Sequence, residues 1–211
     1  METPPRFDET FRQQLRELLT WRRDVRRFRR HPLPQALVDE LISLAHLAPS
    51  VGLSQPWRFV LVENPERRAA IRRNFETANA EALAQYEGSR AGLYARLKLA
   101  GLEEAPVHLA VCADPGTTQG QGLGRGTMPE TIEYSVVTAV HTLWLAARAN
   151  EVGVGWVSIL DPAAVLRALD LPPKWVLIAY LCLGYPEAEQ VTPELEEAGW
   201  EIRAPVTILK R

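Results

Sequence analysis

An arginine-rich segment near the N-terminus carries the most distinctive chemistry of this chain. Residues 21–30 hold six arginines and one acid, Asp24, whereas the whole chain of 211 residues has only three lysines. Arginine matches phosphate geometry through paired N–H donors, and lysine does not. Cations on both sides of Asp24 favour its ionised form, and a carboxylate repels a phosphate. We therefore interpret Asp24 as a base or a polar orienting group beside the same ligand; the alternative is an exposed basic turn in which Asp24 only balances charge.

Two other segments combine polar or small residues in a way that could serve a ligand. Residues 49–57 read Pro-Ser-Val-Gly-Leu-Ser-Gln-Pro-Trp, which taken alone is a helix stop, a polar loop and the start of a strand. Residues 153–159 read Gly-Val-Gly-Trp-Val-Ser-Ile, a strand whose small residues could let a planar ligand approach the backbone. Ser158 inside this apolar strand needs a hydrogen-bond partner if it is buried, and either a carbonyl or a ligand heteroatom could serve.

Hydrophobic periodicity predicts the elements that must position these segments. Phe11, Leu15, Leu18 and Leu19 repeat at helical spacing after Asp8, a suitable N-cap. Further helices are expected over 34–48, 66–102 with a break near 88, 131–150 and 162–169, and strands over 57–62, 107–113, 154–160 and 176–183. Strands separated by helices favour an α/β or α+β sheet covered on its faces. The β-prone tail at 206–209 would need a sheet edge, which a partner subunit could supply.

Composition narrows the class of protein. The formal charge of −2 argues against a bulk binder of nucleic acid or anionic membrane. Cys112 and Cys182 lie in apolar runs and are expected to be buried thiols, so we expect a cytoplasmic protein. Residues 1–5 do not resemble a signal peptide, and the four histidines show no metal-ligand spacing. The glycines of residues 114–127 favour a surface loop or lid over a dinucleotide-binding turn.

Taken together, the three segments resemble the flavin-binding nitroreductase family. The resemblance rests on Arg-Arg-x-x-Arg-x-Phe, Pro-Ser-x-x-x-Ser-Gln-Pro-Trp and Gly-x-Gly-x-Trp, in family order over residues 21–203. Within this family the chain is most similar to the BluB-type 5,6-dimethylbenzimidazole synthases. The segments that point to this group are Arg-Arg-Asp-Val-Arg, Pro-Ser-Val-Gly-Leu-Ser-Gln-Pro-Trp-Arg-Phe, Met-Pro-Glu-Thr at 128–131 and Gly-Trp-Val-Ser-Ile-Leu-Asp-Pro.

The resemblance implies an α+β, nitroreductase-like fold: a central, mostly antiparallel sheet covered by helices, in one flavin-binding domain over residues 1–211. It also implies an intertwined homodimer in which the C-terminal strand is exchanged to the partner. Residues 114–127 would form a loop or lid, and residues 204–211 a C-terminal extension. The bound flavin would be FMN, with no metal.

The resemblance also assigns residues to the FMN site. The first motif would hold the phosphate and the ribityl chain, the Pro-Ser loop would reach the flavin from the partner subunit, and the glycine-containing strand would lie along the ring edge. A basic residue near the C-terminus would complete the phosphate site, and a lysine on a helix would contact the pyrimidine end of the ring. The implied FMN-binding residues are Arg22, Arg23, Asp24, Val25, Arg26, Pro49, Ser50, Val51, Lys98, Gly155, Trp156, Ser158 and Arg203.

Two positions depart from ordinary nitroreductases, which commonly carry serine at Asp24 and asparagine at Leu53. The resemblance implies that reduced FMN and dioxygen are substrates and that FMN is fragmented to 5,6-dimethylbenzimidazole, the lower ligand of cobalamin, with release of erythrose 4-phosphate. Asp24 would act as general base toward the ribityl carbon attached to the ring, and Ser158 would assist near the central ring nitrogen. A separate NAD(P)H-dependent flavin reductase would supply reduced FMN.

Three other functions compete with this interpretation. An NAD(P)H-dependent nitro or quinone reductase is the main alternative. A non-enzymatic flavin carrier would explain the arginines but would leave Asp24 without a task. A nucleic-acid binder is the remotest option, because the single basic patch lacks interleaved aromatic residues.

Overall fold

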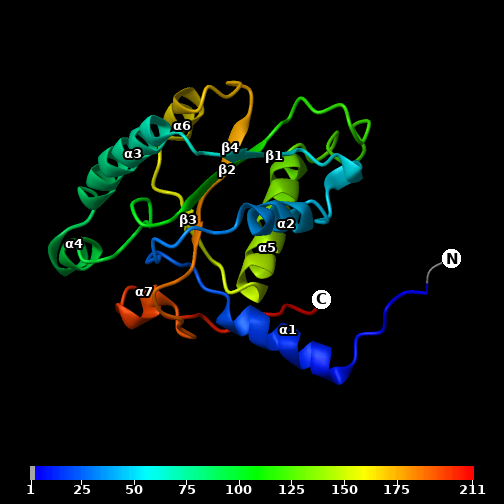
Figure 1. Ribbon diagram of the computed structural model, residues 1–211, viewed down its shortest axis with the longest axis horizontal. Coiled ribbons are helices and arrows are strands. Elements are labelled where there is room, and N and C mark those ends of the chain that lie inside the picture. The colour runs from blue at the N-terminus through cyan, green and yellow to red at the C-terminus, as the bar shows by residue number, and fades with distance from the viewer. Residues whose placement is uncertain (1–2) are drawn as a thin grey trace.

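The computed structural model describes residues 3–211, built around a four-stranded sheet (Figure 1). Met1 and Glu2 lie outside the described residues. They belong to residues 1–5, whose sequence does not resemble a signal peptide. The strands are β1 (Trp57–Leu61), β2 (Val107–Ala113), β3 (Gly153–Val157) and β4 (Val176–Gly184), in the order β1-β2-β4-β3. Every pair within the sheet is antiparallel. The predicted α+β class with a mostly antiparallel sheet is therefore confirmed.

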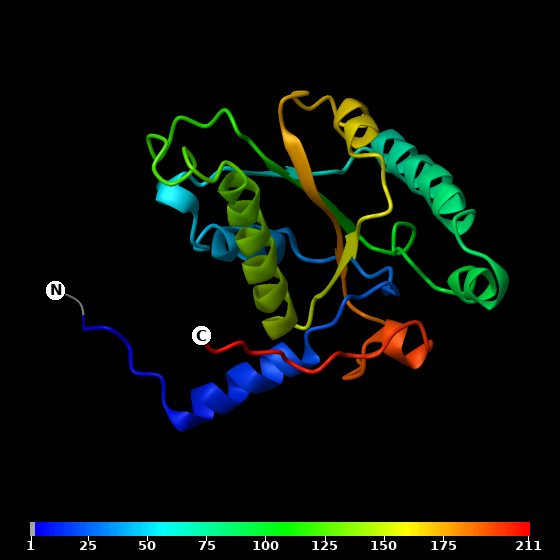
Figure 2. The ribbon, with the colours of Figure 1, turned by 180° about the vertical axis from the view of Figure 1, so that it is seen from behind.

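Helices cover both faces of the sheet (Figures 1 and 2). Helices α2 (Gln35–Ala45) and α5 (Thr131–Ala149) pack on one face and enclose the larger apolar core. Helices α3 (Pro65–Leu83) and α6 (Pro162–Ala168) pack on the other face, over a smaller core that includes Tyr180. Since both faces are covered, the central strands read as continuous apolar runs with little alternation.

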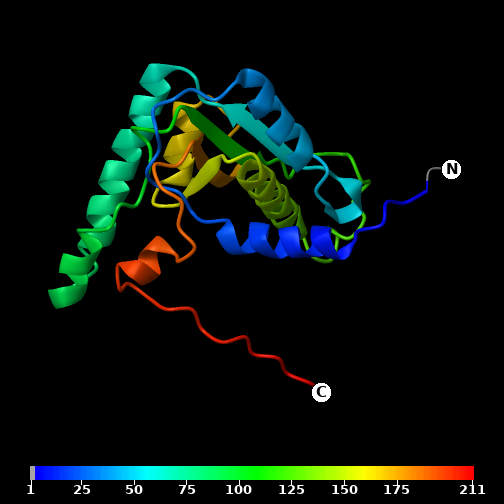
Figure 3. The same ribbon diagram turned by 60° about the horizontal axis from the view of Figure 1, so that its bottom comes forward.

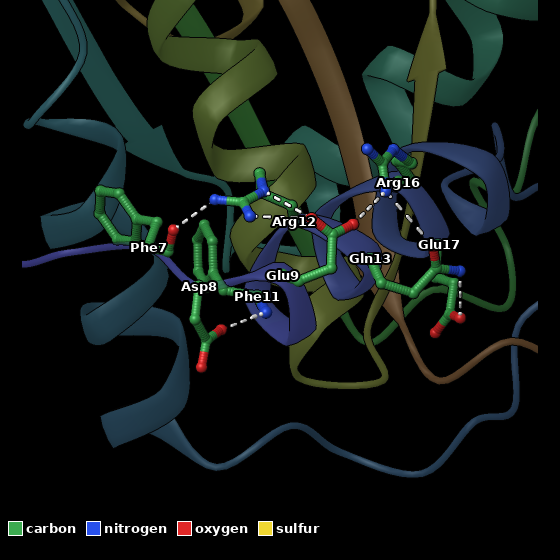
Figure 4. Close-up of polar contacts among 8 residues, drawn as sticks. All are labelled: Phe7, Asp8, Glu9, Phe11, Arg12, Gln13, Arg16 and Glu17. Atoms are coloured by element: carbon green, nitrogen blue, oxygen red, sulfur yellow. Dashed lines mark hydrogen bonds and ion pairs between the residues drawn. The ribbon is translucent and has the colours of Figure 1, made fainter.

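Helix α1 (Glu9–Trp21) lies outside these layers, alongside α5 (Figure 3). Asp8 caps it as predicted, because its carboxylate accepts a hydrogen bond from the Phe11 amide at 2.8 Å (Figure 4). Arg12 pairs with Glu9 at 2.8 Å on the polar side of the helix. No residue of α1 is fully buried. Leu18 is half-buried, and Phe11, Leu15, Leu19 and Trp21 are exposed in the single chain.

Shorter elements complete the chain. They are a 3-10 turn (Val51–Leu53), α4 (Gly88–Tyr94) and α7 (Glu194–Glu197). Beyond Trp200 every residue to Arg211 is exposed and outside regular secondary structure, and the tail leads away from the body (Figure 3). The exchange of a C-terminal strand with a partner therefore stays a prediction.

Two predicted elements were too long. The strand expected over 154–160 ends at Val157, so Ser158 lies just beyond it and is exposed, contrary to its expected place inside the strand. The chain turns there toward Asp161, which caps α6 by accepting hydrogen bonds from the amides of Ala163 and Ala164. The helical region expected to reach residue 102 ends at Tyr94, so the expectation that Lys98 lies on a helix was wrong. The Lys98 carbonyl instead accepts a hydrogen bond from Arg26 Nη1 at 3.1 Å.

Both cysteines are buried and unpaired, as predicted. Burial raises the pKa of the Cys112 thiol to about 11, which keeps it protonated and unreactive. None of the described helices combines the length and the apolar character needed to cross a membrane. Within residues 3–211, no three His, Cys, Asp or Glu side chains gather in a way that could hold a metal ion.

A buried histidine makes folding stability depend on pH. His108 is 1% exposed, and its Nδ1 lies 3.0 Å from the Tyr180 hydroxyl. Burial lowers the pKa of His108 to about 4, the nearby charge of Arg68 acts in the same direction, and a backbone hydrogen bond at Ala105 opposes them. The unfolded chain therefore takes up a proton at higher pH than the folded chain, so stability is lost as pH falls from about 6.5 toward 4.

We expect the free energy of unfolding to fall by about 2 kcal/mol between pH 7.5 and 5.0 on account of His108. His108→Gln removes the titration and keeps a hydrogen-bonding partner for Tyr180, so this variant should lose about 2 kcal/mol less over the same range. Urea unfolding at the two pH values measures the difference. The exposed His141, replaced by glutamine, is the matched control and should follow the parent. A loss in His108→Gln that equals the loss in the parent would contradict the assignment.

Candidate active site

The arginine-rich segment, residues 21–30, runs beside β3, which is an edge strand of the sheet. The Val25 amide donates to the Val154 carbonyl at 3.0 Å, and Asp24 pairs with Val154 as an isolated parallel bridge. A Cβ on Gly155 would lie 2.1 Å from the Val25 carbonyl oxygen. The small residues of β3 thus admit the Val25 backbone on their Cβ side, where the sequence had suggested the approach of a ligand.

Both oxygens of the Asp24 carboxylate are fixed by protein donors. Oδ1 accepts from the Trp156 amide at 2.9 Å, and Oδ2 accepts from Arg26 Nε at 2.8 Å. The Asp24 side chain is 30% exposed, so it is held in place but still open to a ligand. Each carboxylate oxygen has two lone pairs, and each keeps one free for another donor.

Arginine side chains adjoin this carboxylate, and Arg22 and Arg23 differ in how they are held. Arg22 lies over the ring of Trp144, 4.9 Å from its centroid, and its side chain makes no hydrogen bond or ion pair within residues 3–211. Burial lowers the pKa of Arg22, Asp24 opposes that shift, and the positive charge of Arg203 adds to it. Burial also lowers the pKa of Arg23, with Arg203 and Arg22 as further causes. Neighbouring positive charges destabilise each other, so a site of this kind favours the binding of an anion.

Arg23 is more constrained than Arg22. Its guanidinium donates to the Val191 carbonyl, from Nε at 2.7 Å and also from Nη2, and Nη1 donates to the Arg22 carbonyl at 2.6 Å. Trp144 Nε1 donates to the Arg23 carbonyl at 3.2 Å. The structure therefore ties Arg23 to the segment after β4, whereas the Arg22 guanidinium makes no hydrogen bond within residues 3–211 and can donate to an anion.

A cavity opens on the same segment. One wall is formed by Asp24, Val25 and Arg26, and the opposite wall by residues 186–190 and Glu194. Arg148 pairs with Glu189 through two hydrogen bonds, at 2.6 and 2.7 Å, which ties that opposite wall to α5. The acidic side chains of Glu187, Glu189 and Glu194 disfavour a phosphate on this wall of the cavity.

Lys98, Trp156 and Ser158 lie at the borders of the cluster. Lys98 Nζ pairs with Glu104 at 3.0 Å, and its backbone carbonyl is bound to Arg26. Trp156 supplies a backbone donor to Asp24, and its half-buried indole lies 6.3 Å from that of Trp144. The exposed Ser158 hydroxyl makes no hydrogen bond within residues 3–211.

The Pro-Ser loop is held elsewhere in the same chain. Ser50 Oγ accepts from the Gln55 amide at 3.1 Å, the Val51 amide donates to Ser135 at 3.0 Å, and the Pro49 carbonyl accepts from Thr138 at 2.8 Å. Ser135 and Thr138 lie on the first half of α5. Nine residues separate Ser135 from Trp144, which is about 14 Å along a helix axis. One chain therefore does not bring Pro49, Ser50 and Val51 to the arginines.

The glycine-rich segment 114–127 packs on this loop. Gln119 Nε2 donates to the Leu53 carbonyl and to Gln55 Oε1, both at 2.8 Å. A Cβ on Gly120 would lie 2.5 Å from the Gly52 carbonyl oxygen. The segment is thus a packed cover of the Pro-Ser loop in this chain.

Sequence reasoning missed two residues that shape the site. Trp144 supports both Arg22 and the Arg23 backbone, and Arg148 fastens the acidic wall. Both lie on α5, which corresponds to the helix predicted over residues 131–150. Their spacing of four residues places a tryptophan and an arginine on one helix face, and this was the available signal.

Comparison with known proteins agrees with this geometry. The sequence model described as "Nitroreductase family" matches residues 19–185. The crystal structure of oxidized iodotyrosine deiodinase bound to FMN and 3-iodo-L-tyrosine superposes with a TM-score of 0.75 and 25% identity, covering 93% of this chain and 98% of that one. The chain therefore belongs to the nitroreductase family and is an oxidoreductase.

Comparison with sequence relatives places this chain more narrowly within the nitroreductase family. The 5,6-dimethylbenzimidazole synthase of Rhodospirillum rubrum is 54% identical over 211 residues, which is 100% of both chains. A NADH dehydrogenase of Thermus thermophilus is 30% identical over 80% of this chain and 84% of that protein. The family role supported by the full-length match is that of the 5,6-dimethylbenzimidazole synthases, as the sequence motifs indicated.

Proposed function

We propose that this chain catalyses the oxygen-dependent fragmentation of reduced FMN to 5,6-dimethylbenzimidazole, with release of erythrose 4-phosphate. The observation that carries the proposal is a fixed, accessible carboxylate at Asp24 inside a cluster of arginines. Bound in its reduced form, FMN supplies the electrons for dioxygen and the carbon atoms of the product. A carrier or a simple hydride store has no need of a carboxylate in this position.

The phosphate of FMN would be held by Arg22, Arg23 and Arg203. The residues present fit this group, because Arg22 has no acidic partner bonded to it within residues 3–211. Burial, followed by the positive charge of Arg203, lowers the pKa of Arg23, and both also lower the pKa of Arg22. Arg26 is committed to Asp24 and to the Lys98 carbonyl, so it orients the carboxylate. Lys98 is paired with Glu104 and would contact the flavin only at the border of the site.

Asp24 would act as general base. The Trp156 amide and Arg26 Nε fix its two oxygens, and a remaining lone pair would accept a proton from the ribityl carbon attached to the ring. The carboxylate lies at the edge of β3. Its position there depends on the packing of Val25 against Gly155 and on the backbone amide of Trp156. A base fixed in advance avoids the cost of ordering it during the reaction.

Ser158 would donate a hydrogen bond near the central ring nitrogen. Because the hydroxyl is exposed and makes no bond to the rest of the described chain, Ser158→Ala should leave the free energy of unfolding within about 0.5 kcal/mol. Turnover with reduced FMN should fall about tenfold or more, as expected for one lost hydrogen bond to a developing charge, while FMN affinity changes less. Rapid-quench turnover and equilibrium FMN titration measure the two effects. An unchanged turnover would remove Ser158 from the mechanism.

A homodimer would complete the site. The Pro-Ser loop of a partner could supply Pro49, Ser50 and Val51, which one chain keeps away from its own arginines. The exposed apolar side of α1, with Phe11, Leu15 and Leu19 each at least 40% exposed, supports such an interface. The tail beyond Arg203 could then pair with the partner's sheet.

The direct test is aerobic incubation with chemically reduced FMN, followed by mass analysis for 5,6-dimethylbenzimidazole and erythrose 4-phosphate. The proposal expects both products in equal amounts and a matching loss of flavin absorbance. Flavin that is only reoxidised, with neither product formed, would contradict it.

The competing function is that of an NAD(P)H-dependent reductase, favoured by the similarity to the Thermus thermophilus NADH dehydrogenase. Stopped-flow mixing of the FMN complex with NADH separates the two. Rapid bleaching of bound FMN would favour the reductase. Slow or absent bleaching, with product formed only when reduced FMN is supplied, would favour the synthase and the need for a separate flavin reductase.

A further inference from the structure

A second positively charged cavity lies beside α3, between this helix and the segment that precedes β2. Its wall carries Arg30, Arg68 and Arg72 together with a single acid, Glu103. The cavity has a volume of about 380 Å³, which is within the range of small-molecule sites. It shares no lining residue with the cavity at Asp24. Arg30 belongs to the arginine-rich segment 21–30, but it is not one of the residues assigned to FMN.

Arg68 is a fixed donor on the wall of this cavity. Its Nε donates to the Val62 carbonyl at 2.6 Å, and its Nη2 donates to the Pro106 carbonyl at 3.1 Å. These carbonyls orient the half-buried guanidinium, yet no acid pairs with it and its Nη1 makes no hydrogen bond within residues 3–211. A guanidinium has five N–H donors, so several remain for a ligand. A partly buried cation without a counter-ion favours the binding of an anion.

The two other arginines of the cavity are less constrained. Arg72 lies four residues after Arg68, on the same face of α3. Its nearest carboxylates are Glu76 at 3.8 Å and Glu103 at 4.0 Å, and such exposed pairs contribute little to stability. The Arg30 side chain is exposed and makes neither an ion pair nor a hydrogen bond within residues 3–211. Both guanidinium groups can therefore bind a ligand without losing a strong partner.

The charge of the lining indicates the chemistry of the ligand. His108 also lines the cavity, and because burial lowers its pKa to about 4 it is neutral at pH 7. Three arginines and one glutamate then leave the lining with a net charge of +2. A phosphate monoester is close to a dianion at this pH, whereas a carboxylate carries one charge. Arginine also matches phosphate oxygens through paired N–H donors.

The rest of the lining is apolar and suits the carbon part of such a ligand. It consists of Pro65, Ala69, Leu102 and Ala105. We propose that this cavity is a second anion site, which binds a phosphate monoester with its phosphate on the three arginines and its carbon part on the apolar wall. The site does not depend on the proposed fragmentation of FMN, because it uses none of the residues assigned to that reaction.

Calorimetric titration with butyl phosphate tests the site in the full-length protein saturated with oxidised FMN. The bound FMN occupies its own phosphate site, and salt at about 0.15 M screens charges that do not converge on one point. We expect saturable binding of one butyl phosphate per chain. Inorganic phosphate, which lacks the carbon part, should bind more weakly. Equal affinity for the two probes would overturn the assignment of a monoester, and no binding of either would overturn the site.

Arg72→Gln is the variant of choice, because Arg68→Gln would also disturb the contacts of Arg68 with two backbone carbonyls. Arg72→Gln should weaken the binding of butyl phosphate about tenfold, as expected for the loss of charge-assisted hydrogen bonds. Arg30→Gln should weaken it in the same direction. Arg73→Gln is the matched control, since Arg73 is also exposed on α3 and carries the same charge but does not line the cavity. This variant should bind like the parent.

Two results with these variants would overturn the inference. Equal losses in Arg72→Gln and Arg73→Gln would mean that only the net charge of the protein matters. A loss in Arg22→Gln with none in Arg72→Gln or Arg30→Gln would assign the bound phosphate to the arginines beside Asp24. Neither result would bear on the fragmentation of FMN, which is tested by its products.

Discussion

Replacing Asp24 with asparagine should lower the yield of 5,6-dimethylbenzimidazole at least about a hundredfold while FMN still binds. Asparagine keeps the shape and can still accept the Trp156 amide hydrogen bond at Oδ1, but it cannot take up a proton as a base. General-base assistance is typically worth about 10²–10⁴ in rate. Single-turnover product analysis with reduced FMN, beside an equilibrium titration with oxidised FMN, separates chemistry from binding.

The chain offers a closely matched control in Asp114. One oxygen of Asp114 accepts from the Gly116 amide at 3.0 Å, and the other accepts from Arg58 at 2.9 Å. Asp24 has the same pair of partners, a backbone amide and an arginine. Asp114→Asn should therefore cost a similar amount of stability and leave product yield unchanged. Full yield from Asp24→Asn, or equal losses from the two variants, would remove Asp24 as the base.

The fold was largely predictable because its core elements have strong local signals. The four sheet strands appear as apolar runs bounded by turn residues, and the long helix α5 has a buried apolar face, since seven of its residues are buried. The ends of elements were less predictable, because tertiary contacts decide them. The segment around Lys98 leaves the helical path where Arg26, distant in the sequence, binds its carbonyl.

The site was predictable in its residue types but not in their arrangement. The six arginines around Asp24 in the sequence predict an anion-binding site. In the structure Asp24 remains accessible among them. That Arg23 is occupied by the Val191 carbonyl depends on a hydrogen bond between residues far apart in the sequence, which no local pattern encodes. The contact at Gly155 depends on the tertiary structure in the same way. The small residues of this strand suggested that a planar ligand could approach the backbone, and in the structure the Cβ side of Gly155 faces the Val25 carbonyl oxygen. That Gly155 contacts FMN stays a prediction.

Gly155→Ala should therefore be among the most damaging single substitutions in the chain. The new methyl group would lie 2.1 Å from the Val25 carbonyl oxygen, and a backbone atom cannot move aside as a flexible side chain can. Overpacking of this kind typically costs about 1–3 kcal/mol, and the contact distance here places the expected loss at the upper end. Moving the Val25 segment outward would also separate Asp24 from the Trp156 amide, 2.9 Å away in the parent. We expect a loss of about 3 kcal/mol in the free energy of unfolding and a loss of product yield comparable to that of Asp24→Asn.

Gly92→Ala is the matched control for this substitution. Gly92 lies within α4, and a Cβ there meets no atom within 4 Å. Alanine is favoured over glycine in a helix by about 1 kcal/mol, so this variant should be as stable as the parent or more so. Urea unfolding of the two variants beside the parent, with product analysis on each, measures both effects. A Gly155→Ala protein with the stability and product yield of the parent would contradict this prediction. It would mean that the Asp24 carboxylate keeps its position without the close packing of Val25 on β3.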